Sequence, residues 1–470
     1  MGVDFQMRFL RALFFVLIGL LALAPVASAE DSGYTYTHFG PIFPKLPGFT
    51  DPSNQQLADL AQTMLDPNAK AVPPATLAPA DNPLGLGSGY TYFGQFLDHD
   101  LTLDTSPPPT TFVDPRTLVN HRSFRFDLDS VYGDGPKGSP QLYAADHKHF
   151  LVQEPNANGV RDLPRNPDGS AILVEGRNDE NEVIDQIQVA FLKAHNRLID
   201  EGMSFEKARA TLVRHYRAAI LNDFLPHTLQ PATQQMLLGK GGEDSEFDRL
   251  VKNARMTPIE FSVAAYRFGH SQVRLAYELN DTTGKIQVFN AAGNDLHGGR
   301  PIPAGRQIDW DNFFPDLNGE AAHMNFSRKI DTLISAGLFQ LPIPGAEATG
   351  SNVLAYRNMT RAKFYNLPSG QEVAKALGLP VITPAELNLG PGFENGTPLW
   401  YYLLAESQKT EDGAHLGAVG SRIVGETFLT LLKRSEDEDG HQKLLPEIVG
   451  TDGNMTISDL FVFAGVASRL

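Results

Sequence analysis

Apolar residues recur at helical spacing over most of the chain. In residues 183–202 the apolar positions and one histidine fall on one side of a helix, which predicts an amphipathic helix. This stripe consists of Ile184, Ile187, Phe191, His195 and Leu198. The same spacing predicts helices in residues 54–65, 205–225, 324–339, 370–378, 383–388 and 419–434. Alternating strand patterns are sparse, so the chain is predicted to be mainly α-helical with little β-structure.

An apolar run near the start of the chain predicts a secretory signal. Arg8 and Arg11 precede the run, and Pro25 and the small residues 27–29 follow it. The run is about a dozen residues long, which is too short to span a bilayer, although an uncleaved membrane anchor is the alternative. Residues 1–29 are therefore predicted to be a signal peptide, and residues 30–470, which no Ser/Gly linker divides, a single domain.

Composition narrows the expected location and partners. A net charge of -16 disfavours nucleic acid and anionic membranes as partners. No later segment approaches the ~18 apolar residues of a spanning helix, so no stable membrane insertion is expected after signal removal. The chain has no cysteine, which excludes thiolate metal sites, cysteine nucleophiles and a disulfide-linked dimer. Because large exported eukaryotic proteins commonly use disulfides, these features favour a secreted or periplasmic bacterial protein.

The stretch TYFGQFLDHDLTLD, residues 91–104, places a histidine between two aspartates. A helix turns about 100° per residue, so Asp98, His99 and Asp100 must point in three directions and have separate partners. Gln95 lies one turn before His99 and can line the same cavity. A lone helical histidine is more often a core or surface residue, so a catalytic role for His99 depends on other stretches.

Oxygen-bearing groups occupy alternate positions in SFRFDLDSVYG, residues 123–133. In an extended loop Ser123, the Arg125 carbonyl, Asp127 and Asp129 would face the same way. These are hard oxygen ligands suited to calcium, although the spacing is not that of an EF-hand. A polar edge strand is the alternative.

Two further stretches combine arginine with an acid or a histidine. In GRNDEN, residues 176–181, Arg177 and Glu180 can share a face at a helix start. Helix capping is the alternative there, and it is the favoured role for Asp179. In YRFGH, Arg267 lies one turn before His270, after an apolar helical run. A histidine on an apolar face is usually part of the core, but the neighbouring arginine indicates a buried anion.

Taken in this order, the stretches resemble those of the animal-type haem peroxidases, in particular the bacterial, peroxidasin-like branch of the peroxidase and cyclooxygenase superfamily. FLKAHNR, NVLAYRNMTRAKFYNLPSGQEVA and HLGAVGSRIVGETF add to the resemblance, which spans roughly residues 37 to 465. It implies a helical fold with haem b buried between central helices. It also implies an oxidoreductase that reduces hydrogen peroxide, oxidises a halide, thiocyanate or phenolic donor, and serves in the response to oxidative stress.

The resemblance assigns roles around the haem residue by residue. His99 matches the distal acid and base, and Arg177 the arginine that stabilises O–O cleavage. Gln95 matches the residue that holds a water or halide beside them. His270 matches the proximal iron ligand, and Asn358 the residue that accepts a hydrogen bond from it.

The remaining matched positions concern the haem periphery and a calcium ion. Arg267 and Arg361 match arginines near the haem propionates, and Asp98 and Glu180 match carboxylates that form ester bonds to haem methyl groups. The implied calcium ligands are Asp100, Ser123, Arg125 through its carbonyl, Asp127 and Asp129. Asn181 stands where some members have a methionine linked to haem, so that link is not expected.

Two alternatives to a peroxidase share this fold. In cyclooxygenase-like members a radical-forming tyrosine lies three residues before the proximal histidine. Arg267 occupies that position here, which disfavours a haem-dependent fatty-acid dioxygenase. A non-catalytic haem-binding or matrix-binding protein is the other alternative, and the retention of Gln95, His99 and Arg177 disfavours it.

Overall fold

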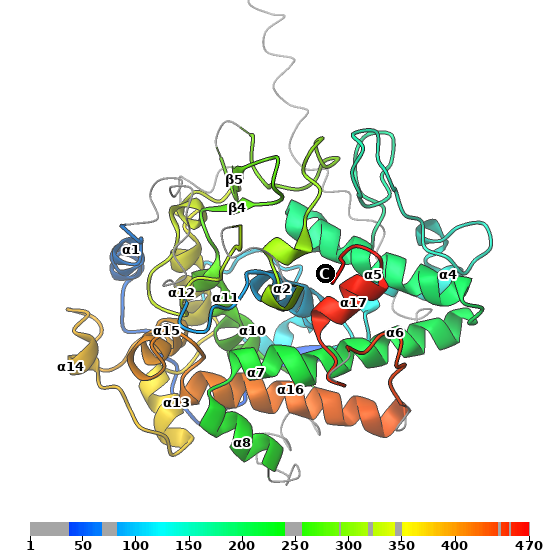
Figure 1. Cartoon of the computed structure of the whole chain (residues 1–470). Coiled ribbons are helices and arrows are strands. Elements are labelled where there is room, and N and C mark those ends of the chain that lie inside the picture. Colours follow the sequence, from blue (N-terminus) through cyan, green and yellow to red (C-terminus); the bar gives the residue numbers. More distant parts are fainter. Residues whose placement is uncertain are drawn as a thin grey trace, which may run out of the picture. The chain divides into compact units, whose positions relative to one another are not determined.

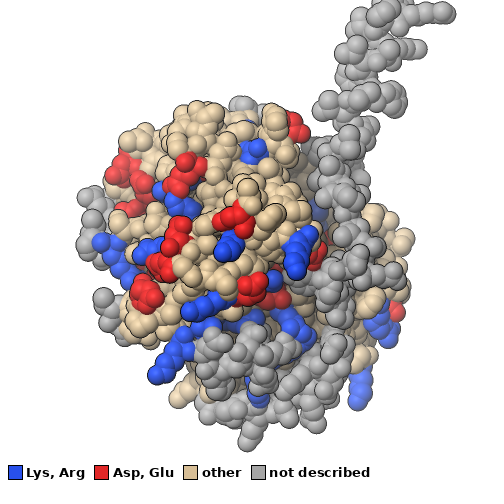
Figure 2. Space-filling model, turned by 90° about the vertical axis from the view of Figure 1, so that its right-hand side faces the viewer, with Lys and Arg blue, Asp and Glu red and all other residues tan. Residues whose placement is uncertain are grey.

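The computed structural model describes residues 37–67, 82–239, 256–290, 293–317, 323–343, 350–439, 443–450 and 453–469. The predicted signal peptide, residues 1–29, lies outside them. Residues Tyr36–Leu470 form one compact unit. None of the helices in the described ranges is long and apolar enough to cross a bilayer. On the face that Figure 2 shows, basic and acidic side chains are scattered among uncharged ones.

Helices dominate the described residues. Those of two turns or more are α1 (Asn54–Thr63), α2 (Gly89–Leu101), α5 (Glu182–Asp200), α6 (Phe205–Ala219), α8 (Pro231–Gly239), α12 (Leu354–Phe364), α13 (Gly370–Ala376), α15 (Leu399–Thr410), α16 (Ala418–Asp439) and α17 (Ile457–Phe463). The shorter ones are α3 (Asp129–Tyr132), α4 (Gly135–Gly138), α7 (Leu225–Thr228), α10 (Ile259–Val263), α11 (Gly269–Gln272) and α14 (Pro384–Leu387). The predicted mainly α-helical fold is confirmed.

Strands are few and short. In one small sheet β1 (Thr37–Gly40) lies between β2 (Val119–Asn120), which is antiparallel to it, and β3 (Met256–Pro258), which is parallel. The other sheet is the antiparallel pair β4 (Ala276–Glu278) and β5 (Lys285–Gln287). The first sheet is attached to the end of α2, because Asn120 Nδ2 donates to the Leu101 carbonyl over 2.8 Å.

Helix α2 lies near the centre of the molecule, with α5 on one side and α11 and α12 on the other (Figure 1). Phe96 of α2 stacks on Phe191 of α5, with ring centroids 4.7 Å apart. The edge of Tyr216, from α6, packs against both rings. Aromatic pairs of this kind add to the apolar area that they bury. The stack therefore fixes α2, which carries residues 95–100, against two long helices.

Most of the predicted helices are confirmed. One predicted helix does not form, and one helix of the structure was not predicted. The predicted helix 324–339 is wrong except for one 3₁₀ turn, η9 (Ala336–Phe339). The main chain of this segment bonds to distant partners instead: Ser327 N–H donates to Leu86 and Ile334 N–H to Met64, both over 2.7 Å. The unpredicted α15 contains LWYYLLA, which is buried on nearly every side and therefore has no amphipathic period.

A buried carboxyl group joins the N-terminal segment to α10, which leads to His270. Glu260 of α10 is fully buried and accepts hydrogen bonds from the main-chain N–H groups of Ile42 and Phe43, over 3.0 and 3.2 Å. Burial raises its pKa from 4.5 to about 7. The folded protein therefore keeps a proton between pH 4.5 and 7 that the unfolded chain releases.

The raised pKa of Glu260 predicts a pH dependence of stability. Its contribution is fully present below pH 4.5 and is lost as the pH rises towards 7, at up to about 1.4 kcal/mol per pH unit. Glu260→Gln removes the titrating group and keeps an acceptor, so its free energy of unfolding should fall less steeply over this range. Urea unfolding of both proteins at pH 4.5, 5.5 and 7 measures the slopes. Equal slopes would contradict the assignment.

Candidate active site

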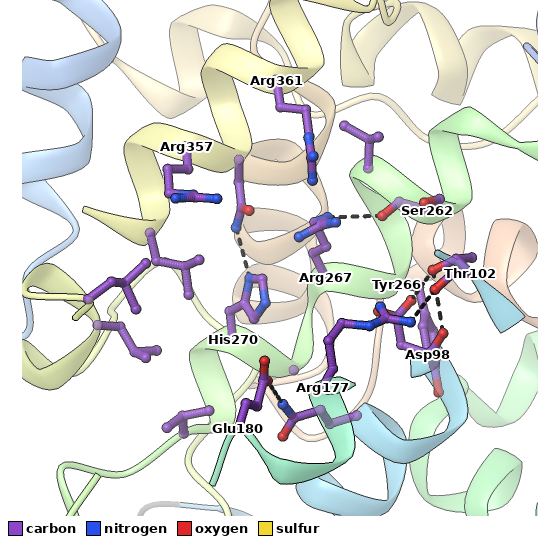
Figure 3. A pocket seen from close by; sticks show the side chains of 18 of the residues that line it. Asp98, Thr102, Arg177, Glu180, Ser262, Tyr266, Arg267, His270, Arg357 and Arg361 are labelled. Atoms are coloured by element: carbon purple, nitrogen blue, oxygen red, sulfur yellow. Dashed lines mark hydrogen bonds and ion pairs between the residues drawn. The ribbon is translucent and has the colours of Figure 1, made fainter. Parts of the chain in front are cut away.

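A cavity of about 820 Å³ lies among α2, α10, α11 and α12 (Figure 3). Gln95, Asp98 and His99 line it from α2. Arg177 and Glu180 line it from the 3₁₀ turn η4 (Gly176–Asp179) and its end. The proximal candidates His270, Arg267, Asn358 and Arg361 line it as well. Every residue that the sequence assigned to the haem therefore borders one cavity.

His99 presents one defined nitrogen to the cavity. Its Nδ1 lies 2.8 Å from Asn178 Oδ1, and Asn178 Nδ2 donates to Gln188 Oε1 over 2.7 Å. Because the amide oxygen of Asn178 faces the ring, Nδ1 carries the proton and donates, and Nε2 keeps its lone pair. Burial and then the charge of Arg177 lower the pKa of His99 to about 4. His99 is therefore a neutral base with Nε2 as its basic atom.

Arg177 is fixed by several acceptors. Its Nε donates to Glu175 Oε1 over 2.8 Å, and its Nη2 donates to Glu175 Oε2 over 3.0 Å. Nη2 also donates to the main-chain carbonyls of Thr102 and His99, at the C-terminal end of α2, where a cation is favourable. Nη1 lies 3.7 Å from Asp98 Oδ2. Burial opposes the charge of Arg177, but Glu175 keeps its pKa above the usual value.

Glu180 faces the cavity from the end of η4. Gln95 Nε2 donates to its Oε1, which is also 3.9 Å from His99 Nε2. Although 47% of the side chain is accessible, that surface borders the cavity, and the protein around it still desolvates the carboxyl group. This burial raises the pKa of Glu180 to about 7, although Arg177 opposes the shift.

His270 lies on the other set of elements, in α11. The sequence predicted a helical run before His270, but the structure divides this segment. Helix α10 ends at Val263, and the 3₁₀ turn η6 (Ala265–Arg267) precedes α11. Burial and then Arg267 lower the pKa of His270 to about 3, so its imidazole is neutral. Its Nδ1 lies 2.9 Å from the side-chain amide nitrogen of Asn358 on α12, whereas the sequence predicted that Asn358 accepts through its oxygen. A neutral imidazole with an oriented partner is suited to bind a metal.

Three arginines gather at the edge of the cavity next to His270. The guanidinium groups of Arg267 and Arg361 face one another in Figure 3, and Arg357 precedes Arg361 by one turn of α12. Burial and then the charge of Arg361 lower the pKa of Arg267 to about 10. Asp104 Oδ2, 3.8 Å from Arg361 Nη2, compensates only part of this charge. An anionic ligand would therefore be stabilised here.

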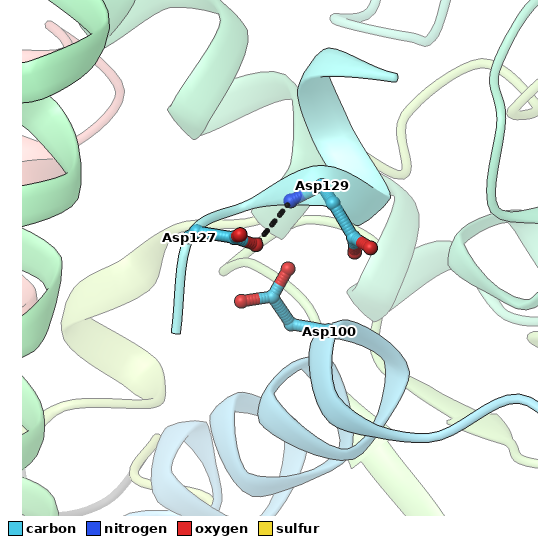
Figure 4. A group of neighbouring side chains, drawn as sticks. All are labelled: Asp100, Asp127 and Asp129. Atoms are coloured by element: carbon cyan, nitrogen blue, oxygen red, sulfur yellow. Dashed lines mark hydrogen bonds between the residues drawn. The ribbon is translucent and has the colours of Figure 1, made fainter. Parts of the chain in front are cut away.

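Asp100, Asp127 and Asp129 form a separate cluster, which we call the aspartate cluster (Figure 4). One carboxylate oxygen from each lies within 4.8 Å of the others. Burial raises the pKa of each carboxyl group, and Asp100, next affected by the charge of Asp127, reaches about 7. Asp129 Oδ1 is buried and has no hydrogen-bond partner among the described residues. A hard cation would compensate these charges and bind this oxygen.

The sequence predicted an extended loop for the segment that carries Asp127 and Asp129, but this loop is turned. Phe124 and Leu128 adopt left-handed backbone conformations, with φ of 50° and 56°. The turns nevertheless bring the predicted groups together, because Ser123 Oγ donates to Asp127 Oδ1 over 2.9 Å and Ser123 N–H to Asp129 Oδ2 over 2.8 Å. The role of the Arg125 carbonyl stays a prediction.

A buried arginine holds η4 in place. Arg165 donates to both oxygens of Asp179, over 2.8 and 3.0 Å, and to Asp162 and Asp185 over 2.9 and 2.7 Å. The predicted capping role of Asp179 is wrong, because Asn181 caps α5 by accepting from the N–H groups of Val183 and Ile184. Arg165 therefore joins residues 162–165 to the segment that carries Arg177 and Glu180.

Sequence reasoning gave no role to several residues that position the site. Asn178 lies inside GRNDEN and Glu175 directly before it, so their closeness to Arg177 in the sequence could have indicated that they contact the site. Arg357 shares a helix face with Arg361 at a spacing of four, which was also readable. Arg122 and Gln188 gave no signal, because their partners lie 53 and 10 residues away.

Comparison with known proteins gives consistent results. A family model described as animal haem peroxidase matches residues 104–386, more than half of the chain, beginning just after α2. Peroxinectin A of Dictyostelium discoideum is 24% identical over 277 residues, which are 55% of this chain and 47% of that protein. Chorion peroxidase of Drosophila melanogaster is 24% identical over 337 residues, 64% of this chain and 40% of that protein. The chain thus spans about half the length of these relatives.

Solved structures share the fold at low sequence identity. Peroxidase A from Dictyostelium discoideum matches with a TM-score of 0.61 and 16% identity, over 93% of this chain and 94% of that chain. Fatty acid alpha-dioxygenase from Oryza sativa matches with a TM-score of 0.52 and 15% identity, over 87% of this chain and 76% of that chain. The same helical fold therefore occurs in a protein named as a peroxidase and in one named as a fatty acid dioxygenase.

Proposed function

Because the chain belongs to the animal haem peroxidase family, we propose that it is a haem peroxidase that reduces hydrogen peroxide and oxidises a small donor. The observation that carries this proposal is the pairing of His99 and Arg177 in the cavity that His270 also borders. A neutral base and a fixed cation are the two groups that heterolytic cleavage of a peroxide requires. A fatty acid alpha-dioxygenase shares the fold, but Arg267 lies three residues before His270, and the neighbouring Tyr266 donates its hydroxyl to the Gly94 carbonyl over 3.1 Å.

The residues present fit haem. His270 would hold the iron through Nε2; a half-turn of the Asn358 amide presents its oxygen to His270 Nδ1–H. Arg267, Arg357 and Arg361 would bind the two propionates, whose negative charges would compensate these half-buried cations. Asp98 and Glu180 line the same cavity, and we propose them as the carboxyl groups that would form ester bonds to the haem. Bound haem would supply the redox-active iron at which peroxide is reduced.

The mechanism follows from the chain's own atoms. His99 Nε2 accepts a proton from hydrogen peroxide and returns it to the departing oxygen. Its Nδ1–H stays bonded to Asn178, which keeps the ring in this tautomer and orientation. Arg177 stabilises the negative charge that develops as the O–O bond breaks. Glu175 and two carbonyls already hold its guanidinium, so little reorganisation accompanies the step.

The cavity and the aspartate cluster support two further parts of the proposal. A cavity of about 820 Å³ that would also hold haem leaves room only for a small donor, which favours a halide, thiocyanate or a phenol. At the aspartate cluster we propose calcium, because three carboxylates offer hard oxygen ligands and the Ser123 hydroxyl lies 2.9 Å from Asp127 Oδ1. Asp100 follows His99 in α2, so a bound calcium ion would help to hold the distal helix.

Haem reconstitution tests the proposed function. We expect the purified chain to take up haem and give a ferric Soret band that shifts on addition of hydrogen peroxide. His270→Gly should lose the proposed iron ligand and much of the haem affinity, and free imidazole should restore the band. His149→Ala, at an exposed ion pair with Asp146 and Asp200, is the matched control. No haem uptake by the wild-type chain would rule out the proposal, and haem that resists acid-acetone extraction would support the ester bonds.

A further inference from the structure

A series of buried ionic contacts leads from the aspartate cluster to the cavity. Asp129 Oδ1 lies 3.7 Å from Arg122 Nη1. Arg122 Nε donates to Glu175 Oε2 over 2.9 Å, and its Nη2 donates to the same oxygen. Glu175 then accepts from Arg177, as described above. The first three side chains of this series are buried, so solvent screens their charges little.

Glu175 is the shared member of the series. Its carboxylate lies between two guanidinium groups, and burial opposes its charge, but Arg177 and Arg122 hold its pKa well below the usual value. One negative charge therefore partly compensates two positive ones. How strongly Glu175 compensates Arg177 depends on how strongly Arg122 competes for it.

Arg122 also faces Asp129 through its Nη1, so its attraction to Glu175 depends on the charge of the aspartate cluster. With a divalent cation bound, three charged aspartates leave a net charge near -1; without it their charge is more negative, by less than two units because burial favours their protonated forms. The uncompensated cluster attracts Arg122 more strongly through Asp129. Arg122 then binds Glu175 less strongly, and Glu175 compensates more of the charge of Arg177. The charge that Arg177 presents to the cavity therefore falls when the cation leaves.

We propose that Arg122 and Glu175 couple cation binding at the aspartate cluster to anion binding beside Arg177. A bound cation strengthens the attraction of Arg177 for an anion in the cavity, and an anion there strengthens cation binding to the same extent. Arg122 and Glu175 are positioning residues, since they act through Arg177. This route is separate from the direct link between Asp100 and His99 along α2. The inference rests on the proposed function, because the anion is a ligand of bound haem.

Fluoride affinity tests the coupling without measuring turnover. Fluoride is a small anion that binds ferric haem, and an absorption titration gives its Kd. In the wild-type holoprotein we expect calcium to tighten fluoride binding at least about fivefold relative to protein in EGTA, within the usual range of coupling between sites. Saturating fluoride should tighten calcium binding by the same factor, since linkage is reciprocal.

Variants locate the route. Arg122→Gln should bring the coupling factor close to one, and Arg122→Lys, which keeps the charge without the forked geometry, should keep an intermediate factor. Arg422→Gln, at a part-buried ion pair with Glu426 on α16, is the matched control and should keep the wild-type factor. The wild-type reciprocity experiment needs no variant, so poor folding of Arg122→Gln would not prevent the test.

Two results would overturn this inference and leave the proposed function standing. One is normal haem uptake with a fluoride affinity that calcium does not change. The other is a full coupling factor in Arg122→Gln, which would assign the link to α2. Absence of haem uptake by the wild-type chain would instead overturn the proposed function, and this inference with it.

Discussion

Replacing His99 by alanine is expected to slow the reaction of the haem-loaded protein with hydrogen peroxide by about 10²–10⁴-fold. The variant loses the neutral base of α2, whose Nε2 faces the cavity in a tautomer set by Asn178 and Gln188. Stopped-flow absorption of the Soret band after mixing with peroxide measures the rate directly. The donor does not take part in this step, so its identity does not affect the result.

Two controls make the His99 experiment specific. His149→Ala removes an imidazole that does not line the cavity and should react at the wild-type rate. Asn178→Ala leaves the imidazole in place but removes the acceptor of its Nδ1–H, so a smaller decrease is expected. A His99→Ala protein that bound haem normally and reacted at the wild-type rate would exclude His99 from the mechanism.

Arg165→Met is expected to destabilise the protein by about 3–5 kcal/mol. The side chain is buried, and its removal leaves Asp162, Asp179 and Asp185 facing one another without a cation. These carboxylates would have to take up protons or draw in water, and both cost folding free energy. Because Asp179 lies in η4, displacement of Arg177 and Glu180 should accompany the loss.

Urea unfolding of the haem-free protein measures the effect of Arg165→Met. Lys375→Met, at an exposed pair with Glu372, is the control for loss of a surface cation and should change stability far less. Asp185→Asn should also be mild, since burial already raises the pKa of Asp185 well above the usual value and favours its neutral form. A wild-type unfolding midpoint for Arg165→Met would show that the cluster is not a structural anchor.

The sequence predicts elements whose signal is local. Helix α5 was predictable because its apolar residues recur at helical spacing, although the fold buries every residue from Glu182 to Leu192. Residues 324–335 carry enough apolar side chains to resemble a helix, but hydrogen bonds to Leu86, Met64 and Gly413 hold them in another conformation. Those partners lie far away in the chain, so no window of sequence contains them.

The site was predictable in its residue types more than in its geometry. Short motifs named His99, Arg177, His270 and the aspartates, and all of these line the cavity or form the cluster. The residues that position them depend on contacts between distant segments. Arg122 and Glu175 are 53 residues apart, and neither belongs to a periodic pattern. Which groups are buried, and hence which pKa values shift, follows only from the three-dimensional packing.

Helix α2 serves two sites from adjacent positions, with His99 in the cavity and Asp100 in the aspartate cluster. A one-residue insertion or deletion before Gln95 would turn both by about 100° and remove both from their partners at once. Evolution can therefore change the length of the connections on either side of α2 more readily than the length of the helix itself. Among homologues, gaps should accumulate in those connections, while residues 89–101 retain one fixed register.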